Sequence, residues 1–264
     1  MSKTINALIL GDVYGKPGFR AVYTGLKNLI KEKRADFVVV NGENAEEGFG
    51  ITPLTAGQII SAGADVITSG NHVWQHKEIY PLLESTDPLL RPANYPAEAP
   101  GKGYVIVEKK GVRIGVVNLQ GRLSMMPIDC PFHVGMSLVK KLQSRTDIII
   151  VDFHAESSEE KEALALYLDG RVSVVVGTHT HVQTADDRIL ENGTGYLTDL
   201  GMCGPDLSVI GSSADISVRR FLTQLPLKIE VADSAAVISG IVAKIDVKSG
   251  KTLHIERFRK ESIV

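Results

Sequence analysis

The chain reads Val172-Ser173-Val174-Val175-Val176-Gly177-Thr178-His179-Thr180-His181 where an apolar run meets two histidines. A short run rich in valine predicts a strand buried in a parallel sheet, and the glycine marks its end. His179 and His181 stand two positions apart, so on an extended backbone both side chains point to one side. Two imidazoles in that arrangement suit one metal ion or two adjacent ions, and a chance occurrence on the surface is the alternative.

Four earlier apolar runs, at residues 5–10, 37–40, 66–69 and 148–153, also end in short turns that carry polar side chains. The turns supply Asp12, then Glu43 with Asn44, then Asn71 with His72, and then His154. In open α/β sheets, ligands bind outside the carboxyl ends of the strands, so parallel neighbours bring such residues together. Each residue alone has a plainer interpretation, such as a turn cap for Asp12. Their joint occurrence at strand ends predicts a metal site.

Amphipathic segments lie between these runs and predict helices. The first is expected to begin at Pro17, and its apolar stripe consists of Phe19, Val22, Tyr23, Leu26, Leu29 and Ile30. Thr52 and Pro53 predict the start of a second helix that runs to about residue 62. Further helices are expected at about residues 75–83 and 132–143, and from Ser157 or Ser158 to residue 167. This alternation of strands and helices predicts a layered α/β domain with parallel strands.

The remaining segments are predicted to be mostly β. One hairpin is expected at residues 104–107 and 112–118, and another turns at residues 191–193 with a second arm at 196–199. A long loop is expected at 201–213, then a short amphipathic stretch at 216–222 and strands at 227–231, 237–246 and 253–258. Parallel strands first and antiparallel strands later imply two sheets that share one core. Without a linker or repeat, residues 1–264 are predicted to form a single domain.

Composition and charge restrict the function classes. The chain has 264 residues, 44% hydrophobic and 23% charged, which is typical of a folded protein. Its net charge of −2 gives no sign of the clustered Lys/Arg excess of a duplex nucleic-acid binder. No segment approaches the roughly 18 apolar residues of a membrane span, and no signal-peptide core is present. Cys130 and Cys203 make no disulfide framework, so free thiols and a cytoplasmic location are expected.

The predicted ligands are oxygen and nitrogen atoms, without cysteine. Such a set favours a two-ion site for iron, manganese or zinc over structural zinc, which prefers thiolates. Two ions about 3.5–4 Å apart can hold a bridging hydroxide that attacks phosphorus. A carboxylate with two oxygens, such as that of Glu43, is the natural bridge between them.

Several of these stretches resemble a known superfamily. Gly70-Asn71-His72, the lone His154 and Gly177-Thr178-His179-Thr180-His181 are similar to the Gly-Asn-His, His and Gly-His-x-His blocks of calcineurin-like metallophosphoesterases. The stretches at residues 11–18, 41–44, 91–96 and 220–226 resemble the bacterial YmdB-type branch in particular, and the likeness covers nearly the whole chain. The resemblance implies a four-layer α/β/β/α sandwich of two mixed sheets flanked by helices. It also implies a di-iron phosphodiesterase that acts on 2′,3′-cyclic nucleotides.

The resemblance also implies a role for each residue. One ion would be held by Asp12, Glu43, Asn44 and His181, and the other by Glu43, Asn71, His154 and His179. His72 would be the proton donor to the leaving ribose oxygen. Tyr14 stands where the superfamily usually has a histidine ligand, and Glu43 replaces the usual bridging aspartate. Val73 replaces the acid that normally follows the Gly-Asn-His block, which leaves open what orients His72.

Alternatives remain on the sequence alone. The same site can serve a phosphomonoesterase or nucleotidase, because substrate choice lies in the surrounding loops. A regulatory protein with a mainly structural metal site is the alternative from another class. Phe49 can stack on a base or anchor its loop, while His76, His133 and His254 are expected to be packed or surface residues. Self-association into a homo-oligomer is expected through the loop at 201–213 and the strands after it.

Overall fold

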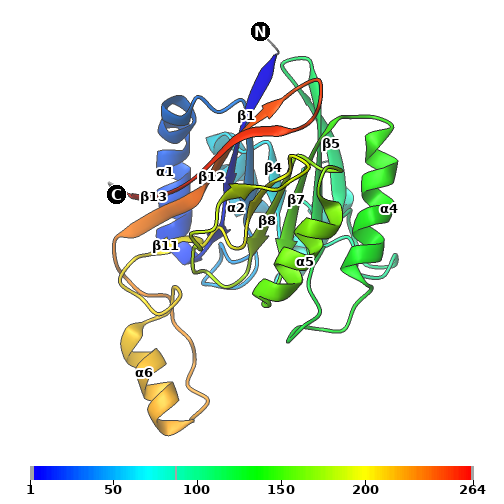
Figure 1. The fold of residues 1–264 in the computed structure, drawn as a ribbon. Helices are drawn as coiled ribbons and strands as arrows, with labels where there is room; N and C mark the ends of the chain where they lie inside the picture. The colour runs from blue at the N-terminus through cyan, green and yellow to red at the C-terminus, as the bar shows by residue number, and fades with distance from the viewer. Residues whose placement is uncertain (1–2, 87, 263–264) are drawn as a thin grey trace.

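Two β-sheets pack face to face, and helices cover the outer face of each (Figure 1). The computed structural model describes residues 3–86 and 88–262. Helices α1 (Gly15–Lys33), α2 (Pro53–Ala62) and the short α3 (Tyr80–Glu84) accompany the first sheet, whereas α4 (Pro131–Gln143) and α5 (Ser158–Leu168) cover the second. This is the four-layer α/β/β/α sandwich that the sequence predicted.

The first sheet joins strands from both ends of the chain. Its order is β2 (Asp12–Val13), β11 (Met202–Pro205), β12 (Ala236–Asp246), β1 (Thr4–Leu10), β3 (Phe37–Asn41) and β4 (Val66–Thr68), and β13 (Thr252–Glu261) pairs with β12. Strands β1, β3 and β4 are parallel, whereas β12 is antiparallel to β1, β11 and β13. Parallel and antiparallel pairing are therefore combined within one sheet.

The second sheet has a parallel centre with a hairpin at each edge. Its order is β5 (Tyr104–Lys109), β6 (Val112–Gln120), β7 (Ile148–His154), β8 (Val174–Thr178), β10 (Gly195–Leu197) and β9 (Arg188–Ile189). The pairs β5–β6 and β9–β10 are antiparallel, which confirms both predicted hairpins. The predicted site residues that follow β1, β3 and β4 contact those that follow β7 and β8. The carboxyl ends of these strands therefore lie at the same edge of the sandwich.

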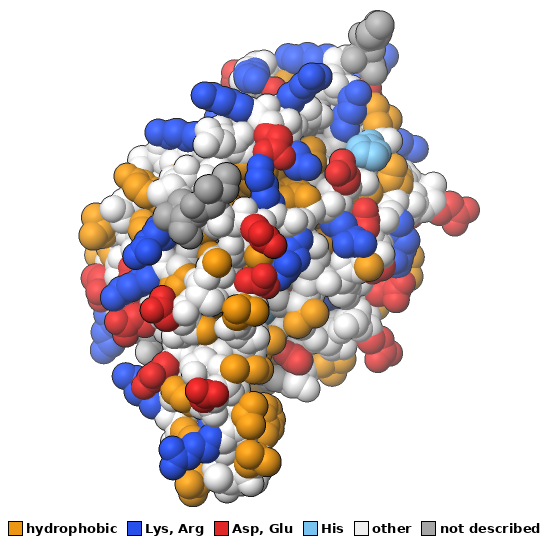
Figure 2. Space-filling view, turned by 90° about the vertical axis from the view of Figure 1, so that its left-hand side faces the viewer, with side chains coloured by type: hydrophobic (Ala, Val, Ile, Leu, Met, Phe, Trp, Pro, Cys, Tyr) orange, Lys and Arg blue, Asp and Glu red, His pale blue; other side chains and the backbone are white. Residues whose placement is uncertain are grey.

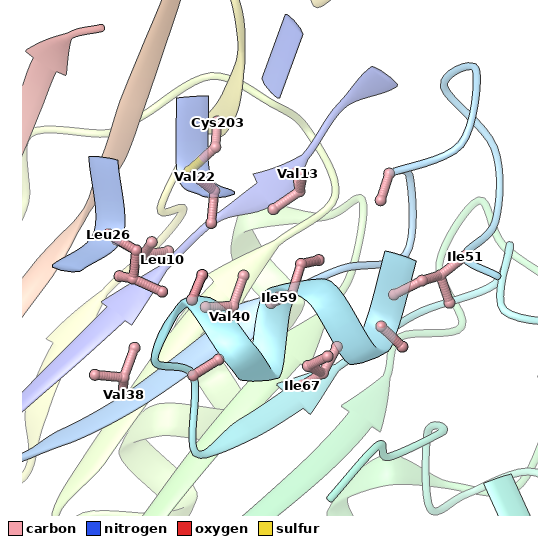
Figure 3. Close-up of a cluster of buried hydrophobic side chains, with 14 of the residues drawn as sticks. Leu10, Val13, Val22, Leu26, Val38, Val40, Ile51, Ile59, Ile67 and Cys203 are labelled. Carbon is pink, nitrogen blue, oxygen red and sulfur yellow. The ribbon is translucent and has the colours of Figure 1, made fainter. Parts of the chain in front are cut away.

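Alternate residues of the central strands face two different cores. In β3, Val38 and Val40 pack under α1 and α2, whereas Phe37 and Val39 face the second sheet. Figure 3 shows the first of these cores, with side chains from α1, α2 and the strands directed toward one another. Burial of each such side chain stabilises the fold by roughly 1.5–3 kcal/mol. Because both faces are buried, the central strands appear in the sequence as nearly continuous apolar runs.

Two details of the helix predictions are wrong. Helix α1 begins at Gly15, two residues before Pro17. A proline is tolerated there because the N–H groups of the first helical turn have no partner within the helix. Tyr23 does not join the core; it is 43% exposed and its ring stacks on Phe19.

Three segments differ from the predicted elements. The helix expected at about 75–83 is a 3₁₀ turn (Lys77–Ile79) followed by α3, because Pro81 lacks the N–H that a continuous helix needs. The loop expected at 201–213 contains β11, whose partners β2 and β12 lie far away in the sequence. Residues 227–231 form no strand; of these, Val231 makes one isolated bridge with Ser212. They belong instead to the connection that returns from α6 (Ala214–Thr223) to β12.

No helix among the described residues combines the length and the hydropathy needed to cross a bilayer.

Candidate metal centre

The eight predicted site residues come together at the carboxyl ends of the strands. They are Asp12 after β1, Glu43 and Asn44 after β3, Asn71 and His72 after β4, His154 at the end of β7, and His179 and His181 after β8. Asp12, Glu43, Asn44 and His154 are buried, whereas the other four are partly exposed. The centre is therefore a largely buried polar cluster with one open side.

One group of ligand atoms surrounds His154 Nε2. Glu43 Oε1 lies 3.0 Å away, Asn71 Oδ1 3.1 Å away and His179 Nδ1 3.0 Å away. Gly70 permits this crowding, since a Cβ on Gly70 would lie 2.2 Å from His154 Nε2. These four side chains are the set that the resemblance implies for one ion.

A second group surrounds the side-chain amide of Asn44. Its Nδ2 lies 3.0 Å from Glu43 Oε1, 3.2 Å from His181 Nε2 and 3.5 Å from Asp12 Oδ1. Glu43 Oε1 thus belongs to both groups. The Asn44 amide directs its nitrogen into the group, and a half-turn of the amide would present Oδ1 there instead.

The outward nitrogens of His154, His179 and His181 each face a hydrogen-bond acceptor. His154 Nδ1 lies 2.9 Å from Thr178 Oγ1, whose own proton is donated to Asp152. His179 Nε2 lies 3.1 Å from Glu156 Oε2, and His181 Nδ1 lies 2.8 Å from the carbonyl oxygen of Ile210. Such partners fix a ring proton on the outward nitrogen and leave a lone pair on the inward one.

The donor set fits a metal ion. Three imidazole nitrogens, two carboxylates and two amide side chains converge without a lysine or arginine among them. Among the described residues, Glu43, His154 and His179 offer ligand atoms within 4.8 Å of one another. Nitrogen and oxygen ligands of this kind suit iron, manganese and zinc.

Charge interactions within the cluster also indicate a site for a cation. Burial would lower the pKa of His154, but the adjacent Glu43 carboxylate raises it to about 9. Burial likewise opposes ionisation of Glu43, yet the charge of His154 and hydrogen bonds from His154 and His72 hold the pKa of Glu43 well below its usual value. Burial and the neighbouring His154 lower the pKa of His179 to about 3. Without a metal ion, a proton on His154 balances Glu43, so proton and metal compete for one lone pair.

The backbone at His179 and His181 is turned, contrary to the extended geometry expected from their spacing. Strand β8 ends at Thr178, and φ is +103° at His179 and +66° at His181. Positive φ costs a non-glycine residue on the order of 1–3 kcal/mol, so the surroundings must hold it. The Asp12 carboxylate accepts from the His179 N–H at 3.1 Å. The turn lets His179 face the first group and His181 the second.

A buried ion pair supports the same turn, and the sequence reasoning missed it. Lys161 Nζ lies 2.7 Å from Asp199 Oδ2, and each side chain is only 1% exposed. Asp199 Oδ2 also accepts from Thr180, at 3.2 Å from its N–H and 2.8 Å from its hydroxyl. Lys161 stands three and seven positions before Leu164 and Leu168 on the buried face of α5, and a lysine in an apolar stripe is a readable signal.

Asp152 is a second missed residue. It is 1% exposed and accepts hydrogen bonds from Thr178, Thr68 and Asn41. Burial raises the pKa of Asp152 above its usual value, against the effect of these donors. Through Thr178 it fixes the orientation of His154. A single acid inside the apolar run 148–153 was the signal available in the sequence.

The structure answers what orients His72 when Val73 replaces the usual acid. His72 Nδ1 lies 2.9 Å from Asn44 Oδ1 and 3.4 Å from Glu43 Oε1, and its backbone N–H donates to Glu43 Oε2 at 3.2 Å. Phe49 packs against the ring edge to face at 5.0 Å between centroids. Val73 itself is fully buried in the core. The side chain of His72 remains 30% exposed on the open side of the centre.

Tyr14 packs beside the centre. Its ring meets the His181 ring at 5.0 Å, and its hydroxyl lies 3.2 Å from Ser212 Oγ. Gly48 and Gly211 pack on the ring so closely that a Cβ would come within 2.8 Å and 2.4 Å of it. Tyr14 therefore braces His181 and takes no ligand position.

The weaker candidates lie outside the cluster. His133 and His254 are exposed, and Cys130 and Cys203 are free thiols. His76 Nε2 lies 3.1 Å from the carbonyl oxygen of Phe49 and anchors that loop. Phe49 and His76 also line a cavity of about 850 Å³, whose lining includes none of the eight residues.

Comparison with known proteins places these features in context. A family model described as YmdB-like protein matches residues 8–258. The chain is 45% identical over 250 residues to a 2′,3′-cyclic-nucleotide 2′-phosphodiesterase of Bacillus subtilis, covering 95% of both chains. A novel phosphatase from Mycoplasma pneumoniae superposes with a TM-score of 0.93 at 36% identity, covering 99% of this chain and 95% of that one. A putative 5′-nucleotidase from Staphylococcus aureus shares the fold at 13% identity and a TM-score of 0.64, covering 99% of this chain and 55% of the other.

Proposed function

The chain belongs to the YmdB-like family, and we propose that it hydrolyses 2′,3′-cyclic nucleotides such as 2′,3′-cAMP at a dinuclear metal centre. The relative from Bacillus subtilis supports phosphodiesterase chemistry. The observation that carries the dinuclear proposal is the position of Glu43 Oε1, which lies 3.0 Å from both His154 Nε2 and Asn44 Nδ2. One carboxylate at the junction of two ligand groups is the arrangement expected of a bridge.

Each group would hold one ion of iron, manganese or zinc. Asp12, Glu43, His181 and the turned amide of Asn44 would hold the first, and Glu43, Asn71, His154 and His179 would hold the second. When bound, the ions would supply a water-derived nucleophile at neutral pH and positive charge opposite the phosphoryl oxygens. Metal analysis of the purified protein would show which of these ions it binds.

His72 is proposed to donate the proton to the leaving oxygen. Asn44 faces Nδ1 of this ring at 2.9 Å, so Nε2 is the nitrogen left for a substrate on the partly exposed side. With the Asn44 amide turned, its Nδ2 would donate to Nδ1 of His72, and the ring proton would then stand on Nε2. A ribose 2′-oxygen is a poor leaving group, and a positioned proton donor typically contributes 10²–10⁴-fold to the rate. The product would be a nucleoside 3′-phosphate.

Phe49 is proposed to contact the nucleoside. Its ring packs on His72 and also lines the cavity of about 850 Å³, which is large enough for a small organic molecule. Phe49→Leu should raise the KM for a cyclic nucleotide more than the KM for a small nitrophenyl ester. An equal effect on both substrates would instead assign Phe49 to the structure of the loop.

A substrate panel tests the proposed reaction. The metal-loaded protein should hydrolyse 2′,3′-cAMP faster than 3′,5′-cAMP, and AMP should react least. Faster release of phosphate from AMP would overturn the proposal in favour of a phosphomonoesterase. A catalytically inactive variant that fully replaces the native protein in cells would instead support a regulatory role.

Variants of His72 test its assigned role. His72→Ala should retain metal, lose most of its activity on 2′,3′-cAMP, and lose much less on a nitrophenyl ester, whose leaving group needs no proton. His133→Ala, an exposed histidine on α4, is the matched control and should behave as the native protein. Equal losses on both substrates would refute the proton-donor role.

The proposal also includes a cytoplasmic location and self-association of the chain. Both cysteines are free, which suits a reducing compartment.

A further inference from the structure

Strand β6 ends in a glutamine beside a histidine of the candidate metal centre. Gln120 on β6 is the register partner of His154 on β7, and Thr178 on β8 is the partner of His154 on its other side. Register partners on neighbouring strands, which lie about 4.8 Å apart, direct their side chains to the same face of the sheet. Thr178 contacts Nδ1 of His154. Gln120 therefore takes the corresponding position on the other side of this histidine.

The side-chain amide of Gln120 is buried and has an unpaired donor. Gln120 is 0% exposed, and its Oε1 accepts from the Tyr95 hydroxyl at 3.1 Å. Its Nε2 has no hydrogen-bond partner among the described residues. Trp74 Nε1 is the one other such buried side-chain atom in residues 3–86 and 88–262. Because buried donors are nearly always paired in native proteins, an acceptor is expected at this position.

The two unpaired donors belong to one aromatic cluster at the edge of the centre. The rings of Trp74 and Tyr95 meet edge to face at 5.1 Å between centroids. Burial raises the pKa of Tyr95, whereas the nearby Trp74 N–H lowers it, although these two groups lack the geometry of a hydrogen bond. The charge of Glu43 raises the pKa of Tyr95 further. The Tyr95 hydroxyl thus lies within electrostatic reach of the carboxylate that both ligand groups share.

The backbone of Gln120 is fixed from both sides. Its N–H donates to Asn94 Oδ1 at 2.9 Å, and its carbonyl oxygen accepts from Asn94 Nδ2 at 2.7 Å. The N–H of the next residue, Gly121, donates to the carbonyl oxygen of His154 at 3.0 Å. The amide is therefore held in position before a ligand arrives, as a preorganised donor requires.

We propose that Gln120 Nε2 donates a hydrogen bond to a non-bridging phosphate oxygen of the substrate. The inference deepens the proposed phosphodiester hydrolysis and rests on it. The phosphate oxygens of a diester only accept, which matches an amide whose own oxygen is already occupied by Tyr95. Most nucleobase edges carry donors as well as acceptors. Because Gln120 stands beside His154, the oxygen it binds belongs to the group at the metal centre, and the base lies toward Phe49.

The two rings beside the amide are only partly buried. Trp74 and Tyr95 are of intermediate exposure, whereas Gln120 is fully buried. A phosphate oxygen reaches Nε2 when one of these rings moves. Trp74 is also the single tryptophan of the chain. Its fluorescence therefore reports occupation of this position.

Calorimetric titration of the purified, metal-containing protein with inorganic phosphate tests the proposal. Gln120→Met keeps the length of the side chain but removes the donor, so phosphate affinity should fall about 10–100-fold, as expected for a hydrogen bond to a charged group. Gln143→Met is the matched control and should keep the native affinity. Gln143 is exposed and lies near Asp147, at the opposite end of β7 from His154. Equal affinities in the two variants would overturn the proposal.

Phosphate attracted to the surface should affect both variants alike. Figure 2 shows Asp and Glu side chains among the Lys and Arg side chains of one face of the molecule, so this face should attract phosphate weakly. The difference between Gln120→Met and Gln143→Met therefore measures the buried amide alone.

Tyr95→Phe is a second variant, which decides the question if Gln120→Met does not fold or loses its metal. It leaves the Gln120 amide in place but removes the hydroxyl that fixes the direction of this amide. Phosphate affinity should fall several-fold while the metal content stays native. An unchanged phosphate affinity in Tyr95→Phe would contradict an amide positioned by this hydroxyl.

The emission of Trp74 shows where the phosphate binds. In the native protein, phosphate should change this emission with the midpoint that calorimetry gives. Emission that stays constant at saturating phosphate would place the anion away from the amide and overturn the proposal.

Kinetics separate recognition of phosphate from recognition of the nucleoside. In Gln120→Met, kcat/KM should fall by the same factor for 2′,3′-cAMP and for a nitrophenyl phosphodiester, since both carry the phosphate group. A loss confined to 2′,3′-cAMP would assign the amide to the nucleoside instead. Phosphate binding is measured without turnover, so its outcome is independent of the substrate panel that tests the proposed function.

Discussion

The buried pair of Lys161 and Asp199 offers a sharp test of how the fold holds the histidine turn. Two substitutions separate its contributions. Lys161→Met removes the cation but leaves the Asp199 carboxylate to accept from Thr180. Asp199→Asn, combined with Lys161→Met, removes both charges. It also replaces one of two acceptor oxygens by an NH₂ group, so the N–H groups of Thr180 and Gly201 can no longer both be bound.

The expected magnitudes follow from the geometry. At a separation of 2.7 Å the two charges attract by about 6 kcal/mol with an effective dielectric constant of about 20. Loss of one partner leaves the other charge buried, which typically costs about 3–5 kcal/mol. Lys161→Met should therefore lose about 3–5 kcal/mol in the free energy of unfolding. The double variant should recover about 2 kcal/mol of that loss, because no unpaired charge remains.

Metal binding should follow the opposite order. Lys161→Met keeps the hydrogen bonds to Thr180 and should hold metal more tightly than the double variant, although it is the less stable protein. Urea unfolding of the metal-free proteins measures stability, and competition with a chelator measures affinity. If the double variant bound metal as tightly as Lys161→Met, Asp199 would not position the turn. A loss below about 1 kcal/mol in Lys161→Met would contradict the buried pair itself.

Three further predictions follow from other parts of the structure. Thr178→Val should weaken metal binding about 10–100-fold, because His154 loses the partner of its outward nitrogen, and Thr178→Ser should restore it; equal affinities would refute this role. Burial would raise the pKa of Asp186, but hydrogen bonds from neighbouring threonines outweigh burial and lower it. The stability that the Asp186 carboxylate contributes is therefore present above its unfolded pKa and is lost as pH falls through its folded pKa. In Asp186→Asn the free energy of unfolding should therefore fall less steeply between about pH 5 and 2 than in the native protein. An unchanged slope would contradict the lowered pKa of Asp186. Burial raises the pKa of Cys203 to about 12, so a thiol reagent at pH 8 should label Cys130 alone until the protein is denatured.

Much of the fold could be predicted because its signals are local. The runs at 5–10, 37–40 and 148–153 are apolar except for Asn6 and Asp152, since each strand packs against a core on both faces. The turns after them carry the site residues. The family-like motifs then implied the four layers. Strand β11 could not be predicted in this way, because its pairing with β2 and β12 arises only in three dimensions.

The site was predicted as a set of residues but not as a supporting framework. His154, His179 and His181 follow apolar runs, so their convergence could be inferred from topology. Asp152 stands out as the one acid in an apolar run, but its hydrogen-bond partners lie on other strands. The contacts of Asp199 with Lys161 and Thr180 likewise arise only in three dimensions. The spacing of His179 and His181 suggested an extended backbone, whereas positive φ at both residues turns them toward different groups.

Metal analysis of the anaerobically purified protein tests the central claim most directly. The account predicts two ions of iron, manganese or zinc per chain in the native protein, and loss of both ions together in Glu43→Gln, because Glu43 belongs to both ligand groups. A native protein with a single ion, or a Glu43→Gln variant that keeps both ions, would contradict the shared-carboxylate centre.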